Sequence, residues 1–166
     1  LMKNLYGTPF GAEGINPLAY AFLGALVGSA ARILAGPIAD RVGGGKVTLV
    51  AVLGIGFSAL YTSFTLAPTS VDEFPTFLWG MLAIFFFAGG GNASTCKQMP
   101  MIFERRQAGG VIGWTAAIAA FGPFVFGVMF ATGNAQLLYW FGFVSCMIGA
   151  AITWFYYARP GAEKPS

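Results

Sequence analysis

Arg32 is the residue whose type and position point most directly to chemistry. It is the only charged residue inside five long apolar segments, and it lies eight residues before Asp40, where a charged break begins. Eight helical residues span about 12 Å, and half of a bilayer's hydrocarbon core is about 15 Å thick. A helix through Arg32 therefore places it near the membrane midplane, where insertion of a charge costs about 2.5–3.5 kcal/mol.

Two interpretations of Arg32 are open. No carboxylate of this chain lies at the same depth. The acids that flank the segments are Glu13, Asp72 and Glu73 on one side and Asp40 and Glu104 on the other. Arg32 either pairs with a carboxylate or carbonyl in a part of the protein outside this chain, or binds an anion in a water-filled cavity. Its planar fork of donors suits a planar trigonal oxyanion better than a lysine ammonium does.

Small residues accompany this arginine. Gly24, Gly28 and Gly36 stand at four-residue intervals from Arg32, so they share one helix face and allow a neighbouring helix or a substrate to approach. A second glycine-rich run, residues 89–95, reads GGGNAST. Its polar side chains, Asn92 among them, serve either tight packing through local hydrogen bonds or the substrate path.

A third small-residue run opens the fourth segment. Gly109, Gly113 and Ala117 follow the four-residue spacing typical of close helix contacts. Thr115 is the polar exception on this segment, and Pro123 is expected to kink it.

The elements that position these residues are membrane helices. A spanning helix needs about 20 mostly apolar residues. The sequence predicts spans over 18–39, 47–67, 76–95, 108–132 and 135–157, with breaks at 40–46, 68–75, 97–107 and 133–134. Residues 1–6 are predicted to end an earlier span, followed by a turn-like run over 7–17. We expect residues 1–166 to form one all-α transmembrane domain with five full helices, the end of a sixth, and a tail over 159–166.

Composition supports a membrane protein. The chain is 57% hydrophobic and only 9% charged, whereas a soluble domain carries about 25% charged residues. There is no histidine, which argues against haem ligation and histidine-based metal sites, so no cofactor or metal is expected. The net charge of +3 is too small to indicate nucleic-acid binding. Cys96 and Cys146 have no metal-like spacing and are expected to fill the core.

The charges of the breaks alternate by side. One set of breaks carries Arg41, Lys46, Lys97, Arg105, Arg106, Arg159 and Lys164, and the other carries the acids Glu13, Asp72 and Glu73. The positive-inside rule therefore predicts a cytoplasmic side for the basic breaks and the C-terminus. Asp40 stands at a helix C-terminus, where a carboxylate opposes the helix dipole. We expect Arg41 or a neighbouring helix N-terminus to stabilise it.

Residues 36–46 read GPIADRVGGGK and resemble the cytoplasmic loop motif of the major facilitator superfamily, Gly-x-x-x-Asp-Arg-x-Gly followed by basic residues. The matching positions are Gly36, Asp40, Arg41 and Gly43, and the basic cluster is reduced to Lys46. In that superfamily the motif joins the second and third helices of each six-helix half. The resemblance implies that this chain is one half of such a bundle.

Three stretches together are similar to the C-terminal half of the nitrate/nitrite porter family: residues 29–37 (SAARILAGP), 89–95 (GGGNAST) and 109–117 (GGVIGWTAA). In that family each half contributes one membrane arginine to a central anion site, and Arg32 matches the C-terminal one. The Gly-rich fourth segment matches the family's second nitrate signature. Taken together with the small-residue face beside Arg32, the predicted substrate-binding residues are Arg32, Gly28, Asn92, Gly109, Gly113 and Thr115.

The resulting expectation is a secondary transporter in the inner membrane, not an enzyme. It would move nitrate or nitrite by alternating access, together with a six-helix N-terminal half absent from this chain. A transporter of another small anion, such as a carboxylate, is the alternative, and an assembly module of close-packed helices is a third. The spans contain no acid, which favours nitrate–nitrite exchange over proton symport.

Overall fold

A computed structural model describes residues 1, 3–9, 14–131 and 134–162 of the chain. Four residues named in the sequence predictions lie outside the described residues: Glu13, Thr132, Gly133 and Lys164. The predictions placed them in a break, at a span end or in the tail. In chain order the elements are η1 (Lys3–Gly7), η3 (Pro17–Ala19), α1 (Ala21–Val42), α2 (Gly44–Ser63), η4 (Val71–Glu73), α3 (Phe74–Ile102), α4 (Arg105–Ala120), α5 (Gly122–Ala131), α6 (Ala135–Thr153) and η5 (Trp154–Ala158).

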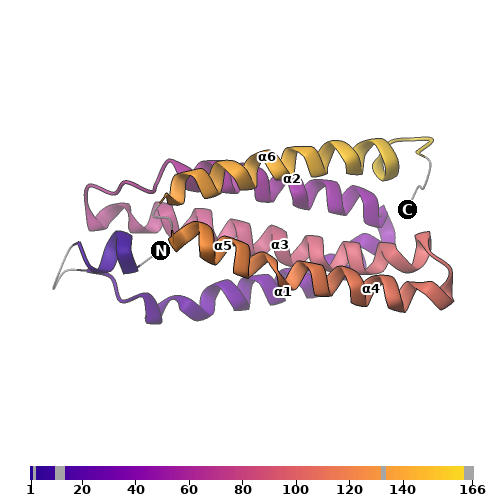
Figure 1. Cartoon of the computed structure of the whole chain (residues 1–166), viewed down its shortest axis with the longest axis horizontal. Helices are drawn as coiled ribbons and strands as arrows, with labels where there is room; N and C mark the ends of the chain where they lie inside the picture. Colours follow the sequence, from indigo (N-terminus) through magenta and orange to yellow (C-terminus); the bar gives the residue numbers. More distant parts are fainter. Residues whose placement is uncertain (2, 10–13, 132–133, 163–166) are drawn as a thin grey trace.

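Five stretches are long and apolar enough to cross a membrane: Ala21–Val42, Gly44–Ser63, Val71–Ile102, Arg106–Met129 and Ala135–Ala158. Helices suit such stretches because each satisfies its own backbone hydrogen bonds where no water is present. The predicted class, an all-α membrane protein with five full-length helices, is confirmed. Figure 1 shows the α1–α2 turn, the α3–α4 link and η5 at one end of the bundle, with the α2–α3 connection at the other.

The α1–α2 turn is shorter than predicted. A break was expected over 40–46, but α1 continues to Val42 and α2 begins at Gly44. Only Gly43 separates them, and its φ of 101° is a conformation that side chains other than glycine rarely adopt. Charged residues therefore occupy the last turn of α1 and the first turn of α2. Long charged side chains near a helix end reach the membrane surface, so they do not need to end the helix.

The C-terminal end of helix α3 also differs from the predicted span boundary. The span was predicted to end at Thr95 with Lys97 in the following loop, yet α3 runs without interruption from Phe74 to Ile102. The glycines at 89–91 stay helical because they pack closely against α1 and α2, and tertiary packing overrides their low helix propensity. Lys97 is consequently a helical residue. Cys96, expected in the core, is exposed in this chain.

The fourth span is divided as its proline suggested. Helix α4 ends at Ala120 and α5 begins at Gly122, with the break at Phe121. Pro123 has no N–H to donate to the carbonyl four residues earlier, and its ring clashes with that carbonyl. The helical hydrogen bonds resume when Val125 N–H donates to the Phe121 carbonyl, at 3.0 Å.

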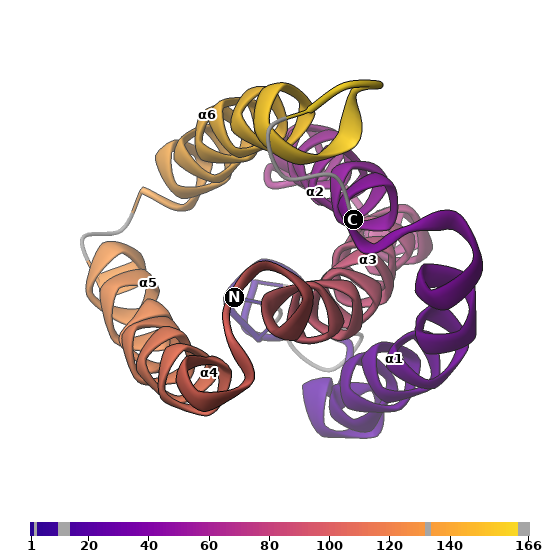
Figure 2. The ribbon, with the colours of Figure 1, turned by 90° about the vertical axis from the view of Figure 1, so that its right-hand side faces the viewer.

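Helix α3 is the centre of the arrangement. It packs against α1 on one side and α2 on the other, and α2 also packs against α6. The end-on view in Figure 2 shows α1, α3, α2 and α6 as neighbours along an arc, with α4 and α5 on the opposite side. The N-terminal π-turn η1 covers one end of the bundle, where Tyr6 is fully buried and its ring lies 5.3 Å from that of Phe74.

Candidate anion-binding site

Arg32 occupies the middle of α1, eleven residues after Ala21 and ten before Val42. At 1.5 Å per residue this is about 15–17 Å from either end of the helix, so the side chain lies at mid-depth. Its side chain is exposed. Within the described ranges no carboxylate forms an ion pair with it; the single ion pair found there joins two other residues. An unpaired guanidinium at that depth is suited to an anion ligand.

A cavity of about 340 Å³ opens beside Arg32 between α1 and α3. Its lining residues are Gly24, Ala25, Gly28, Ser29, Arg32, Phe85, Ala88, Gly89 and Asn92. Three of the predicted substrate-binding residues, Arg32, Gly28 and Asn92, are thus brought together from two helices. The polar groups are a guanidinium, an amide and the Ser29 hydroxyl, and no lining residue is acidic. All three can donate hydrogen bonds, which an oxyanion requires.

Two glycines allow α1 and α3 to approach at this cavity. A β-carbon on Gly89 would overlap the backbone of Gly28, and one on Gly24 would lie 2.7 Å from the Phe85 ring. The predicted small-residue face of α1 therefore packs against α3. Arg32 lies on the same face of α1, but its side chain is long and charged, and it lines the cavity beside this close contact.

Two polar side chains of the glycine-rich run of α3 contribute to helix packing. Ser94 and Thr95 donate to the Gly91 carbonyl at 3.0 and 2.9 Å, and the Ser94 hydroxyl also hydrogen-bonds that of Thr48 on α2 at 2.8 Å. These are packing interactions within the bundle. Asn92, by contrast, is exposed and lines the cavity of Arg32.

The remaining predicted substrate residues do not gather at Arg32. Gly109 and Gly113 on α4 have no atom of another residue within 4 Å of an added β-carbon. Thr115 lines a separate cavity of about 300 Å³ with Thr48, Gln98 and Tyr157, among others. In this chain α4 therefore presents its small residues to open space.

The loop motif builds a contact that the sequence analysis did not predict. The Lys97 amine on α3 forms an ion pair with Asp40 and also donates to the Gly36 carbonyl at 2.9 Å. The expected partner of Asp40, Arg41 or a helix N-terminus, is wrong, because Asp40 stands one turn after Gly36 on the face of α1 that packs against α3. Arg41 and Lys46 are exposed, and Gly43 makes the turn.

Three features of the structure were not predicted from the sequence: Ser29 in the cavity, the Lys97–Asp40 ion pair, and the Thr48–Ser94 hydrogen bond, which contributes to packing. The pairing of Lys97 was not predicted because a charged residue was assumed to end the membrane span. The signal was present, since extending the four-residue spacing of Gly24, Gly28 and Gly36 reaches Asp40. Within the described residues, no group of three His, Cys, Asp or Glu side chains is placed so that it could hold a metal ion.

The chain is similar in sequence to known nitrate/nitrite transport proteins. No protein-family model matches the sequence. The chain is 54% identical, over 99% of its length, to a protein of Thermus thermophilus named probable nitrate/nitrite antiporter NarK2. Over 87% of its length it is 29% identical to the nitrate/nitrite transporter NarU of Salmonella typhimurium and 26% identical to NarU of Escherichia coli (strain K12).

The chain spans 37–38% of the length of these relatives. The match nevertheless covers all five membrane-length helices, the α1–α2 turn and the cavity around Arg32, because it extends over 99% of the chain. The chain belongs to the nitrate/nitrite porter family of the major facilitator superfamily.

Proposed function

We propose that this chain is the C-terminal half of an inner-membrane transporter for nitrate and nitrite, and that Arg32 binds the anion. One observation carries the proposal: a guanidinium at the middle of a membrane-length helix lines a cavity of about 340 Å³ and has no acidic partner among the described residues. The names of the relatives support the choice of substrate.

In this proposal Arg32, Asn92 and Gly28 are one part of a site completed by an N-terminal half. The planar guanidinium donates two parallel hydrogen bonds to a planar oxyanion, and Gly28 leaves room for its approach. Gly109, Gly113 and Thr115 would join the substrate path only through surfaces that face the other half. Transport follows when the two halves rock about this midplane site.

The basic end of the bundle is proposed to face the cytoplasm. One end of the bundle, which holds the α1–α2 turn and η5, carries the basic residues Arg41, Lys46, Lys97, Arg106 and Arg159, whereas Asp72 and Glu73 lie at the other end. The positive-inside rule assigns the basic end to the cytoplasm. No carboxylate lines the Arg32 cavity, which favours nitrate–nitrite exchange over a proton-coupled mechanism in this half. Transport of another small anion, such as a carboxylate, is the alternative.

The substitution Arg32→Lys in the full-length transporter tests the role of Arg32. It keeps the charge but removes the bidentate geometry, so we expect nitrate binding to weaken by about 2 kcal/mol or more, the scale of charge-assisted hydrogen bonds in a desolvated site. Nitrate uptake into proteoliposomes and the thermal unfolding temperature are measured side by side. Arg106→Lys, at an exposed position near the helix end, is the matched control.

The expected result is a large loss of uptake with an unchanged unfolding temperature, and near-normal behaviour of the control. Near-normal uptake by Arg32→Lys contradicts the anion site. Equal losses of uptake and thermal stability identify Arg32 as a structural residue instead. Competition of nitrate uptake by acetate or formate distinguishes a nitrate site from a carboxylate site.

A further inference from the structure

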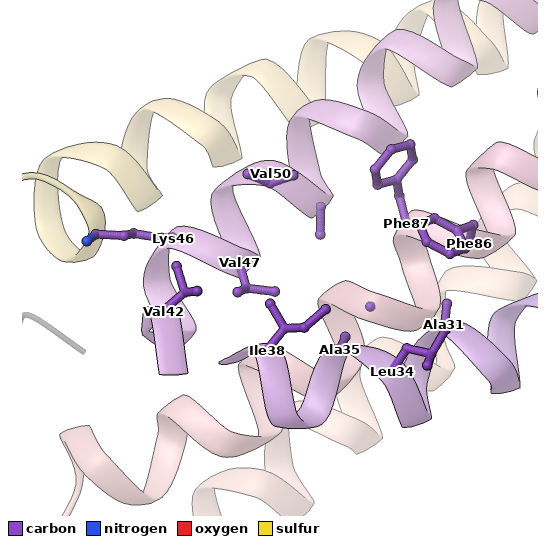
Figure 3. Close-up of a pocket in the computed structure, with 12 residues that line it drawn as sticks. Ala31, Leu34, Ala35, Ile38, Val42, Lys46, Val47, Val50, Phe86 and Phe87 are labelled. Atoms are coloured by element: carbon purple, nitrogen blue, oxygen red, sulfur yellow. The ribbon is translucent and has the colours of Figure 1, made fainter. Parts of the chain in front are cut away.

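A second cavity lies between α1, α2 and α3 and is almost entirely apolar. Its volume is about 290 Å³. Its lining residues are Ala31, Leu34, Ala35, Ile38, Val42, Lys46, Val47, Val50, Ala51, Phe86, Phe87 and Gly90. Figure 3 shows side chains from both helices α1 and α2 converging on it, with Phe86 and Phe87 of α3 at one end and Lys46 at the other. We call this cavity the apolar groove.

The groove has a narrow floor and an open mouth. Ala31, Ala35 and Ala51 are buried, whereas Leu34, Ile38 and Val50 are 60%, 52% and 60% exposed. The small residues thus leave a slot, and the larger ones form its rims. A slot with exposed rims in a membrane-spanning segment is open to whatever surrounds the helices.

The length of the groove matches one leaflet. From Ala31 to Val42 along α1 is eleven residues, or about 16 Å, and half of a hydrocarbon core is about 15 Å. The groove is therefore long enough for one extended acyl chain to reach from the α1–α2 turn to mid-depth.

The two cavities open on different faces of the α1–α3 pair. They share no lining residue. At about 100° per residue, Ala31 and Ala35 lie roughly a quarter turn of α1 from Arg32, and Phe86 and Gly90 lie on the side of α3 away from Asn92. If Arg32 faces the other half of the transporter, as proposed above, the groove faces lipid. The inference rests on the proposed function in this one step.

Lys46 gives the groove a polar end. Its side chain lines the groove at the end formed by the α1–α2 turn, and its amine points away from the apolar residues (Figure 3). Among the described residues no side chain pairs with this amine. Basic residues near a membrane surface attract anionic lipids, at about 1 kcal/mol for each charge.

We propose that the apolar groove binds one acyl chain of an anionic phospholipid and that Lys46 pairs with its phosphate. The acyl chain fills the slot between α1, α2 and α3 over the depth of one leaflet, and the head group lies at the α1–α2 turn. The lipid thereby bridges the loop motif and the three packed helices.

Native mass spectrometry of the full-length transporter tests the head-group contact. The protein is titrated with phosphatidylglycerol, and phosphatidylcholine of the same chain length is the neutral comparison. For Lys46→Gln we expect the dissociation constant of the tightest phosphatidylglycerol to rise about fivefold, the equivalent of about 1 kcal/mol. Arg106→Gln removes the same charge from the same end of the bundle outside the groove, and we expect no such change.

Two further variants test the slot itself. Val50→Trp fills the groove from an exposed rim position, whereas Val144→Trp makes the same change at an exposed site on α6 outside it. We expect only the first to remove the bound phosphatidylglycerol. A photo-crosslinking residue at Ile38 should label lipid.

Four outcomes overturn the proposal: equal effects of Lys46→Gln and Arg106→Gln, equal binding of phosphatidylcholine, retention of lipid by Val50→Trp, or crosslinks from position 38 to protein. A crosslink to the N-terminal half would assign the groove to the interface between halves, and one to another transporter molecule would assign it to a dimer. Failure of Arg32→Lys to affect uptake, with lipid binding intact, would reject the nitrate site and leave the groove standing.

Discussion

The α1–α3 pair and the α4–α5 span are built from the same small residues but use them in opposite ways. On α1 and α3, a β-carbon added to Gly24, Gly28 or Gly89 meets atoms of the facing helix within about 3.3 Å or closer. On α4, a β-carbon added to Gly109 or Gly113 meets no other residue within 4 Å. No residue is buried in the most apolar stretch of the α4–α5 span.

This contrast shows what a four-residue spacing of small residues encodes. The pattern predicts that something comes close, because small residues let backbones approach. It does not say what approaches. For the glycines of α1 the neighbour is α3, while for Gly109 and Gly113 of α4 the described residues offer none. We expect the open face of α4 to be the surface that meets the N-terminal half or the substrate path, and the variants below test this expectation.

The largest expected effect is on the closed side of the comparison. Gly89→Ala places a methyl group against the backbone of Gly28, which cannot move aside as a side chain can. We expect α1 and α3 to separate and the full-length transporter to lose about 1–3 kcal/mol of stability, the usual cost of overpacking. Thermal unfolding in detergent is the measurement.

Gly90→Ala is the control for that variant. It changes the same residue type one position along, where the added β-carbon would lie 3.6 Å from the Ala35 methyl group, an ordinary contact. We expect its unfolding temperature to stay close to that of the unmodified protein. A similar loss in both variants would show that any glycine of α3 is intolerant, and the specific contact with Gly28 would lose its support.

The sequence predicted the class of the fold because membrane helices are specified locally. Long apolar segments need no tertiary information to be recognised, and five of them were found where the structure has five. Boundaries were less predictable. Charge and glycine were interpreted as helix ends at Asp40 and Lys97, yet packing and side-chain length keep both residues helical.

The candidate site was predictable to the extent that it lies on one stripe of one helix. Arg32 is recognisable as the single charge inside a predicted span, and Gly28 follows from the four-residue spacing. Asn92 was also predicted, and it lines the same cavity where Gly89 brings α3 against α1. The Lys97–Asp40 ion pair required knowledge of which helices pack together. Whether Gly113 and Thr115 reach the same site depends on residues outside this chain, so no local pattern could decide it.

A second prediction concerns the ion pair at the end of the closed contact. Both side chains are substantially exposed, Lys97 at 41% and Asp40 at 62%, so the pair contributes about 0–1 kcal/mol to stability. The pair joins α1 to α3, and we expect it to hold the two helices together during the transport cycle. We expect Asp40→Asn to slow transport cycling in the full-length protein while nitrate binding at Arg32, about 12 Å away along α1, remains near normal.

Lys97→Met should have the same effect, and the double variant should be no slower than either single one, because one contact is removed in each case. Exchange rates in proteoliposomes and equilibrium nitrate binding are compared, with the exposed Asp72→Asn as a control at the opposite end of the bundle. Additive slowing by the two variants, or loss of binding with unchanged cycling, would contradict a shared role.

The smallest expected effect on stability is on the open side. Gly113→Leu adds a large side chain where nothing lies within 4 Å, so within this chain it creates no clash. We expect the stability of the full-length protein to change by no more than about 0.5 kcal/mol, as for most surface substitutions. Uptake of nitrate should nevertheless fall, because the leucine occupies the face through which α4 meets the other half or the substrate.

Gly142→Leu on α6 is the matched control, since a β-carbon there also meets nothing within 4 Å. It is expected to preserve both stability and uptake. If both leucine variants transport normally, the small residues of α4 face lipid. The α1–α3 pair and the α4–α5 span then differ only in how deeply their glycines are buried. If Gly113→Leu instead destabilises the protein as much as Gly89→Ala does, α4 is packed as tightly in the full-length transporter as α3 is here. The separation of uptake from stability at Gly113 is therefore the result that distinguishes a moving or substrate-facing surface from a static one.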